Sequence, residues 1–182
     1  MVRATAEQSR REIVDVATRM FAARSYEATS LSEIAAEWGG SKATVLYHFH
    51  TKAAILRDLV QPAVTELRAV LDDADALPAA ESRRAVVLGF LTLVINRREA
   101  LVCYPAALRH IVEIPELEDL GIEELGERLV RILSAGADDP LSLVSATVFL
   151  NGVLIAAQTH DDLAPDDLRD VLTALAQRIL DL

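Results

Sequence analysis

Residues 30–49 read SLSEIAAEWGGSKATVLYHF, and they contain the start signals of two short helices. Ser30 followed by Glu33 is a capping box, in which the two residues satisfy each other's free backbone N–H groups at a helix start. The Gly39-Gly40 pair ends that helix, because glycine adopts left-handed backbone angles without steric cost. Ser41 then caps a second helix. Two short helices joined by a tight glycine turn form a helix-turn-helix, whose second helix fits the major groove of DNA.

The helices around this motif follow from the spacing of apolar residues. Ile13, Ala17, Met20 and Phe21 recur with helical period and predict a helix from about residue 5 to residue 24. A longer helix covers residues 52–75, where Pro62 predicts a kink or a break. Prolines divide the rest of the chain into further helical pieces: Pro78, Pro105, Pro115, Pro140 and Pro165. No segment alternates apolar and polar residues for long, so the predicted fold class is all-α.

The composition excludes several classes of protein. The 182 residues are 52% hydrophobic and 25% charged, which excludes a disordered chain and allows a sizeable core. Cys103 is the single cysteine, so a disulfide framework and a cysteine zinc site are excluded, and a reducing cytosol fits. The polar start indicates no secretory signal. The longest apolar run, residues 144–157, is interrupted and shorter than the ~20 residues of a membrane span. We therefore expect a cytoplasmic protein without membrane contact.

Charge is distributed unevenly along the chain. Residues 1–58 carry eight basic and seven acidic side chains, whereas residues 59–182 carry ten basic and 21 acidic ones. Five of the eight aromatic residues lie within the first 49. An acidic surface repels nucleic acid, so any DNA contact is expected in the amino-terminal part. The alternative is that the acidic surface only keeps the protein soluble. We predict a DNA-binding domain at residues 1–51 and a second helical domain at residues 52–182.

Several runs of residues resemble the TetR (tetracycline-repressor-like) family of regulators. The resemblance covers roughly residues 9–58, and its main runs are REIVDVATRMF at 11–21, YEATSLSEIA at 26–35, SKATVLYHF at 41–49 and TKAAIL at 51–56. The chain departs from the family pattern at Ser25, where glycine is usual. It also has Trp38 in place of alanine and Gly40 in place of a small apolar residue. Its tyrosine, Tyr47, lies one position after the site of the family's phosphate-contacting tyrosine, which is Leu46 here.

The recognition helix and its surroundings supply the candidate DNA contacts. Lys42 and Thr44 lie on the outer face, opposite Val45, and Tyr47 is turned by 100° from the family's position, towards the groove floor or the next phosphate. Lys52 begins a helix, where the dipole disfavours a cation, and a phosphate contact would explain its placement. The predicted DNA-binding residues are Arg11, Thr29, Ser30, Ser41, Lys42, Thr44, Tyr47, His48 and Lys52. Ser30 also has a sufficient role as a cap, His48 fits a packing role equally well, and Trp38 fits the core better than a contact.

By resemblance, residues 59–182 bind a small-molecule effector and form a homodimer. The helices expected at about residues 141–160 and 166–180 form the predicted dimer interface, and the alternative is that they are buried within one subunit. The effector candidates combine apolar lining with a few polar groups. They are Phe90, Leu93, Tyr104, Leu108, His110 and Phe149. Phe90 and Leu93 are equally compatible with a plain core, and Cys103 with inert packing.

An enzymatic function finds little support in the sequence. His110 with Glu113, and His160 with its two following aspartates, lack the third ligand that a metal site needs. No phosphate-binding glycine loop and no nucleophile elbow are present. We therefore predict no enzyme, no cofactor and no metal. The predicted function is a homodimeric regulator, a repressor that binds a palindromic DNA operator and is released by an effector. The alternative is a constitutive DNA-binding or protein-interaction module without an effector.

Overall fold

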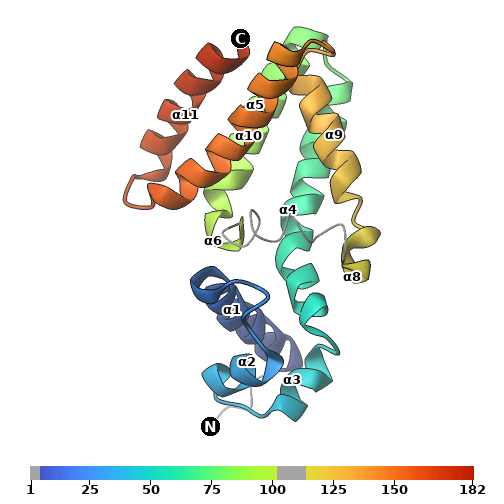
Figure 1. Ribbon diagram of the computed structural model, residues 1–182, viewed down its shortest axis with the longest axis vertical. Coiled ribbons are helices and arrows are strands. Elements are labelled where there is room, and N and C mark those ends of the chain that lie inside the picture. The colour runs from blue at the N-terminus through green and yellow to red at the C-terminus, as the bar shows by residue number, and fades with distance from the viewer. Residues whose placement is uncertain (1–4, 102–113) are drawn as a thin grey trace. The chain divides into compact units, whose positions relative to one another are not determined.

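The computed structural model describes residues 5–101 and 114–182, with only the backbone given at residues 99–100. Within these ranges the chain is helical and has no strand, which confirms the all-α prediction (Figure 1). The helices are α1 Ala6–Arg24, α2 Leu31–Trp38, α3 Lys42–His48, α4 Lys52–Asp75, α5 Ala79–Asn96, α6 Arg98–Leu101, α8 Pro115–Glu118, α9 Ile122–Leu133, α10 Pro140–Thr159 and α11 Pro165–Leu180.

The chain forms two compact units. The amino-terminal unit comprises Met1–Pro62 and Val102–Leu120, and the carboxy-terminal unit comprises Ala63–Leu101 and Gly121–Leu182. Helix α4 continues through Pro62, so of the two predicted outcomes, a kink or a break, the break does not occur. Apolar side chains on both sides of the proline are buried, and this burial offsets the missing backbone hydrogen bond. Other prolines start helices as predicted, at the first positions of α8, α10 and α11. Pro105 lies outside the described residues.

The first three helices enclose a small core in the amino-terminal unit. Its fully buried side chains include Ile13, Ile34, Val45 and Phe49. Each predicted cap is confirmed. The Ser30 hydroxyl accepts from the Glu33 N–H at 3.2 Å, and the Glu33 carboxylate accepts from the Ser30 N–H at 2.9 Å. The backbone of Gly39 is left-handed (φ 84°), and the Ser41 hydroxyl caps α3 by accepting from the Thr44 N–H at 3.1 Å.

Arg10 connects α1 to the end of the recognition helix. Its guanidinium donates two hydrogen bonds to the Asp58 carboxylate, at 2.6 and 2.8 Å, and a third to the backbone oxygen of His48 at 2.8 Å. The same group lies 4.2 Å from the centre of the Phe49 ring. One arginine therefore fixes the carboxyl end of α3 against α1 and α4, because its fork of donors serves two acceptors at once.

Helix α5 is the centre of the carboxy-terminal unit and packs against α9, α10 and α11. Its buried side chains include Val86, Val87, Leu91 and Val94. The Arg83 guanidinium donates to the backbone oxygen of Leu133 at 2.7 Å and to that of Leu180 at 2.5 Å. These two oxygens lie at the ends of α9 and α11, where helix carbonyls have no intrahelical partner.

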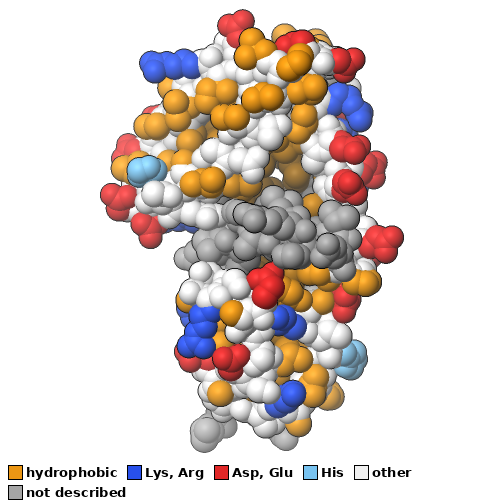
Figure 2. Space-filling view, in the orientation of Figure 1, with side chains coloured by type: hydrophobic (Ala, Val, Ile, Leu, Met, Phe, Trp, Pro, Cys, Tyr) orange, Lys and Arg blue, Asp and Glu red, His pale blue; other side chains and the backbone are white. Residues whose placement is uncertain are grey.

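Helices α10 and α11 are present at the predicted positions and expose an apolar face. On α10, Leu141, Val144, Val148 and Ile155 are 55–76% exposed. On α11, Val171 and Leu175 are 52% and 40% exposed. Figure 2 shows hydrophobic side chains gathered over α10. We call these six residues the α10–α11 face. Exposed apolar patches on soluble proteins mark interaction surfaces.

Within the described residues, α10 is the one helix that is long and apolar enough, by length and composition, to cross a membrane. The helix is longer than the apolar run at residues 144–157, because it extends beyond that run at both ends. A single such helix is weak evidence for a membrane span, because core helices of soluble proteins meet the same criteria.

Candidate nucleic-acid interface

The recognition helix α3 presents one buried and one exposed face. Val45 is fully buried, whereas Lys42, Thr44 and Tyr47 are exposed, Tyr47 with 77% of its surface. Thr44 and Tyr47 are three residues apart and so share one side of α3, whereas Lys42 is exposed at the first position of the helix. No ion pair among the described side chains holds Lys42. The exposed surface of α3 thus carries a cation, a hydroxyl and an amphipathic aromatic ring.

Other predicted contacts surround this helix. The hydroxyl of Ser41 is shared between the Thr44 N–H and the Thr44 hydroxyl, the latter at 2.8 Å. The His48 ring is half-buried and stacks edge-on against Tyr47, with 5.2 Å between ring centres. Arg11 is exposed and has Glu7 as a distant ion-pair partner at 4.0 Å. All three lie on the same unit as α3, and Ser41 has a structural role in addition to any contact.

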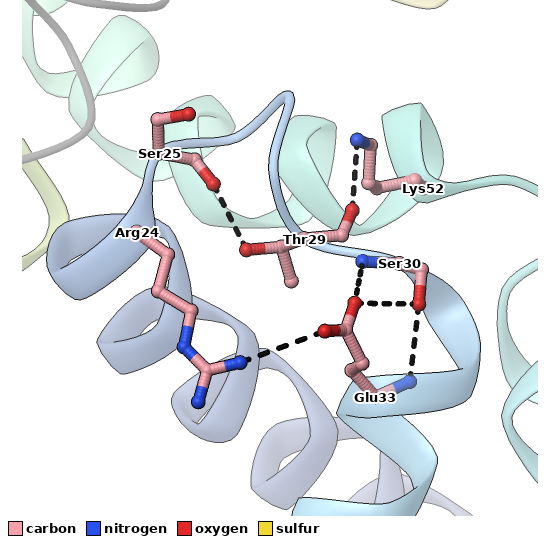
Figure 3. A network of polar contacts seen from close by, with 6 residues as sticks. All are labelled: Arg24, Ser25, Thr29, Ser30, Glu33 and Lys52. Atoms are coloured by element: carbon pink, nitrogen blue, oxygen red, sulfur yellow. Dashed lines mark hydrogen bonds and ion pairs between the residues drawn. The ribbon is translucent and has the colours of Figure 1, made fainter.

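The turn before α2 contains a dense network of polar contacts (Figure 3). The Thr29 side chain is 2% exposed, and its hydroxyl donates to the backbone oxygen of Ser25 at 2.9 Å. Ser30 and Glu33 form the capping box, and Arg24 pairs with Glu33 at 3.5 Å. The hydrogen bond from Ser30 lowers the pKa of the Glu33 carboxyl. A phosphate contact by the Thr29 hydroxyl would require this turn to open.

Lys52 belongs to the same network. Its ammonium donates to the backbone oxygens of Tyr26 at 2.6 Å and Thr29 at 2.9 Å, and it lies 4.1 Å from the centre of the Tyr26 ring. Burial lowers the pKa of the Lys52 ammonium and raises that of Tyr26 to about 12. The sequence indicated a phosphate contact for this lysine. In the structure its ammonium also holds the turn between α1 and α2 against the start of α4, and the phosphate contact stays a prediction.

Ser25 stands where the family usually has glycine, and its backbone has the angles that glycine adopts. Its backbone has φ 81° and ψ 160°, a conformation that is essentially reserved for glycine. Glycine is usual at this position, and serine therefore stores strain in the turn whose carbonyls Lys52 holds. The serine hydroxyl offsets little of this strain energy, since the hydrogen bond that it accepts from the Ala28 N–H is long, at 3.4 Å.

Helix α8 is held on the amino-terminal unit by Arg57. Its guanidinium forms a two-pronged ion pair with Asp119 and donates to the backbone oxygen of Glu116. The Thr51 hydroxyl donates to the Glu116 carboxylate at 3.0 Å. Hydrogen bonds from Arg57 lower the pKa of Asp119. The sequence gave no signal for these contacts, which join residues far apart in the chain.

The predicted effector residues are only partly described. Tyr104, Leu108 and His110 lie outside the described residues. Phe90, Leu93 and Phe149 are buried, with 2–6% exposure. A shallow pocket of about 450 Å³ lies between α4 and α5, and Leu93 lines it together with Glu66, Val70, Leu88 and Asn96. In the described parts of the chain, no group of three histidine, cysteine or acidic side chains is placed to hold a metal ion.

Together, the capped pair of short helices and the exposed outer face of α3 define a helix-turn-helix DNA-binding protein. Residues 13–59 match the sequence profile of the family described as bacterial regulatory proteins, tetR family. These residues therefore form a tetR-family DNA-binding domain, and the resemblance found in the sequence is confirmed.

Solved structures extend the likeness to most of the chain. The ketosteroid transcriptional regulator KstR2 of Mycobacterium tuberculosis is 17% identical, with a TM-score of 0.76 over 94% of this chain and 93% of that one. A TetR-family member from Streptomyces coelicolor A3 is 20% identical, with a TM-score of 0.75 over 92% and 89%. AibR, solved with isovaleryl coenzyme A and operator DNA, is 20% identical, with a TM-score of 0.63 over 92% and 97%. No curated protein matches the chain significantly. Over about nine tenths of its length the chain therefore shares the fold of these transcriptional regulators.

Proposed function

We propose that the protein is a cytoplasmic, homodimeric repressor that binds a palindromic operator and is released by a small molecule. The observation that carries this proposal is the exposed surface of α3, where Lys42, Thr44 and Tyr47 are exposed while Val45 is buried in the core. A helix so placed inserts its amino-terminal end into the major groove. Residues 1–51 then act as the DNA-binding domain, and residues 52–182 as the effector and dimerisation domain.

The candidate contacts divide into two groups by their place in the structure. Lys42, Thr44 and Tyr47 reach the groove, where lysine pairs with guanine or phosphate and threonine with base edges or a thymine methyl. Contacts to the sugar-phosphate backbone come from the groups around this helix, namely Arg11, Ser30, Ser41 and His48. Thr29 and Lys52 also support the DNA-binding domain from inside, because Thr29 is buried and the Lys52 ammonium donates to backbone oxygens of the turn before α2.

Dimerisation is proposed through the α10–α11 face. Two recognition helices one turn of DNA apart, roughly 34 Å, need a two-fold axis between subunits. A two-fold interface uses the same patch on both subunits, and the exposed residues of α10 and α11 supply an apolar patch suited to this. Sedimentation of the purified protein tests the proposal, and a monomer at micromolar concentration would contradict it. Requirement for detergent instead would favour a membrane role for α10.

Effector release is proposed from the likeness to AibR. AibR was solved with an acyl-coenzyme A and operator DNA, so acyl-coenzyme A esters are one ligand class to test. A ligand that prefers the DNA-free conformation lowers operator affinity by a population shift, and such coupling is typically about 1–3 kcal/mol. Equal operator affinity with and without every bound ligand would favour the alternative, a constitutive DNA-binding module.

The deciding experiment is selection of binding sites from random DNA, followed by titration of the selected site with salt. We expect a two-fold symmetric site, and an affinity that falls steeply with salt because phosphate contacts release counterions. Lys42→Ala should weaken binding and flatten this dependence. Failure to enrich any sequence would overturn the proposal, provided that the protein used is folded by circular dichroism.

A further inference from the structure

The two glycines in the turn between α2 and α3 are required for different reasons. Gly39 has φ 84°, and a side chain there would meet no atom within 4 Å, so only its backbone angle demands glycine. Gly40 has no such angle. A methyl group on Gly40 would lie 2.5 Å from Cε3 of the Trp38 ring and closer still to Cζ3. The Trp38 ring therefore occupies the space that a side chain at position 40 would fill.

The Trp38 ring is held in this place from the other side. Its indole N–H donates to the Glu12 carboxylate of α1 at 3.2 Å, and Glu12 also accepts from the Gln8 amide at 3.1 Å. The ring cannot swing away from Gly40 without losing its hydrogen bond to α1. The backbone of Gly40 is fixed as well, because its N–H donates to the oxygen of Ala35 at 3.0 Å.

We propose that Trp38 is a positioning residue for DNA reading, which sets the start of the recognition helix through its contact with Gly40. Ser41, the cap of α3, directly follows Gly40, so the place of the ring determines where α3 begins. Helix α3 has seven residues, and a shift at its first residue moves the whole outer face. The inference rests on the proposed function, in which α3 reads the operator.

The test is a double-mutant cycle of Gly40→Ala, Trp38→Ala and the double variant, measured on the selected operator and on random DNA. In the wild-type background Gly40→Ala forces the ring or the turn to move, and overpacking of this kind predicts roughly a tenfold or greater loss in the ratio of specific to non-specific affinity. In the Trp38→Ala background the same change should alter this ratio less than twofold. Gly126→Ala is the matched control, because a side chain there meets nothing within 4 Å.

Trp38→Phe keeps a ring beside Gly40 but removes the donor to Glu12. It is the second background for Gly40→Ala, and it replaces Trp38→Ala if that variant does not fold. In this background the loss caused by Gly40→Ala should persist. All affinities are measured at a temperature where each variant is folded, so that a change in stability alone leaves the ratio unchanged. Two results would overturn the inference in a protein whose wild type binds its operator. One is that the effects of Gly40→Ala and Trp38→Ala on the ratio of specific to non-specific affinity are additive. The other is that Gly40→Ala keeps the wild-type ratio. A wild type that enriches no sequence would overturn the proposed function, and the positioning role with it.

Discussion

Lys52→Met tests whether Lys52 supports the fold or contacts DNA. The substitution keeps most of the aliphatic stem and removes the ammonium that serves the oxygens of Tyr26 and Thr29. Hydrogen bonds to a charged group contribute about 1.5–3 kcal/mol, and the partial exposure of this lysine places the total loss near the lower end, at about 2 kcal/mol. For a chain of this length each kcal/mol lowers Tm by about 2–4 °C, so we expect a fall of about 4–8 °C.

Lys42→Met is the matched comparison, since it removes the same charge from an exposed position without a partner among the described residues. Each phosphate contact contributes about 0.9 to the slope of log affinity against log salt, and two subunits double the effect to about 1.8. We expect Lys42→Met to flatten the slope and leave Tm within a degree or so of wild type. Lys52→Met should lower Tm and leave the slope unchanged.

The two measurements distinguish structural support from a phosphate contact. Tm reports how much a lysine stabilises the fold, and the slope of log affinity against log salt reports how many phosphates the protein contacts. A Lys52→Met protein with the wild-type Tm and a flattened slope would refute the reasoning. The three carbonyl and ring contacts of Lys52 would then contribute nothing measurable, and the phosphate contact indicated by the sequence would be right.

Three further predictions follow from described contacts. Val148→Glu places a charge in the α10–α11 face and should convert a dimer to monomers in sedimentation. Leu88→Glu on α5, where the side chain is 49% exposed against 55% for Val148, should not. Identical sedimentation profiles of the two variants would rule out this face as the interface. Ser25→Gly relieves the strained backbone and should raise stability by about 1–2 kcal/mol in urea unfolding, a gain that an unstrained turn would not give. The hydrogen bond from Arg57 lowers the pKa of Asp119 in the folded protein. The ion pair therefore contributes its full stability above the ordinary carboxyl pKa of about 3.9, and this contribution is lost as the pH falls through the lower pKa of the folded state. Hydrogen exchange of α8 should therefore be faster in Asp119→Asn than in wild type at pH 7, and this difference should vanish in acid.

The sequence predicted the helix boundaries of the amino-terminal unit because they depend on local chemistry. Ser30 and Ser41 cap helices through their own neighbours, and Gly39 ends α2 through its backbone angle. These signals act within four residues, so no knowledge of the fold is needed to find them. The exposed face of α3 followed from the same helical period once the anchoring residue Val45 was recognised.

The contacts that the sequence did not predict join residues far apart in the chain. Lys52 reaches carbonyls more than twenty residues away, and Arg10 meets Asp58, so neither pairing leaves a periodic signal. The departures at Trp38 and Gly40 looked independent in the sequence, yet one contact accounts for both. The sequence also left open whether Pro62 kinks or breaks its helix, and α4 is continuous there, with buried side chains on both sides of the proline.

Arg83 has a consequence for how freely the carboxy-terminal unit can vary. One guanidinium supplies the last carbonyls of two helices, α9 and α11, that are separated by the whole of α10. Lysine is a poor replacement, because a single ammonium lacks the planar fork that serves acceptors in two directions. Substitution of Arg83 would therefore leave the carboxyl ends of both α9 and α11 without this hydrogen-bond donor. A second substitution near one of these ends could restore a donor for that helix only.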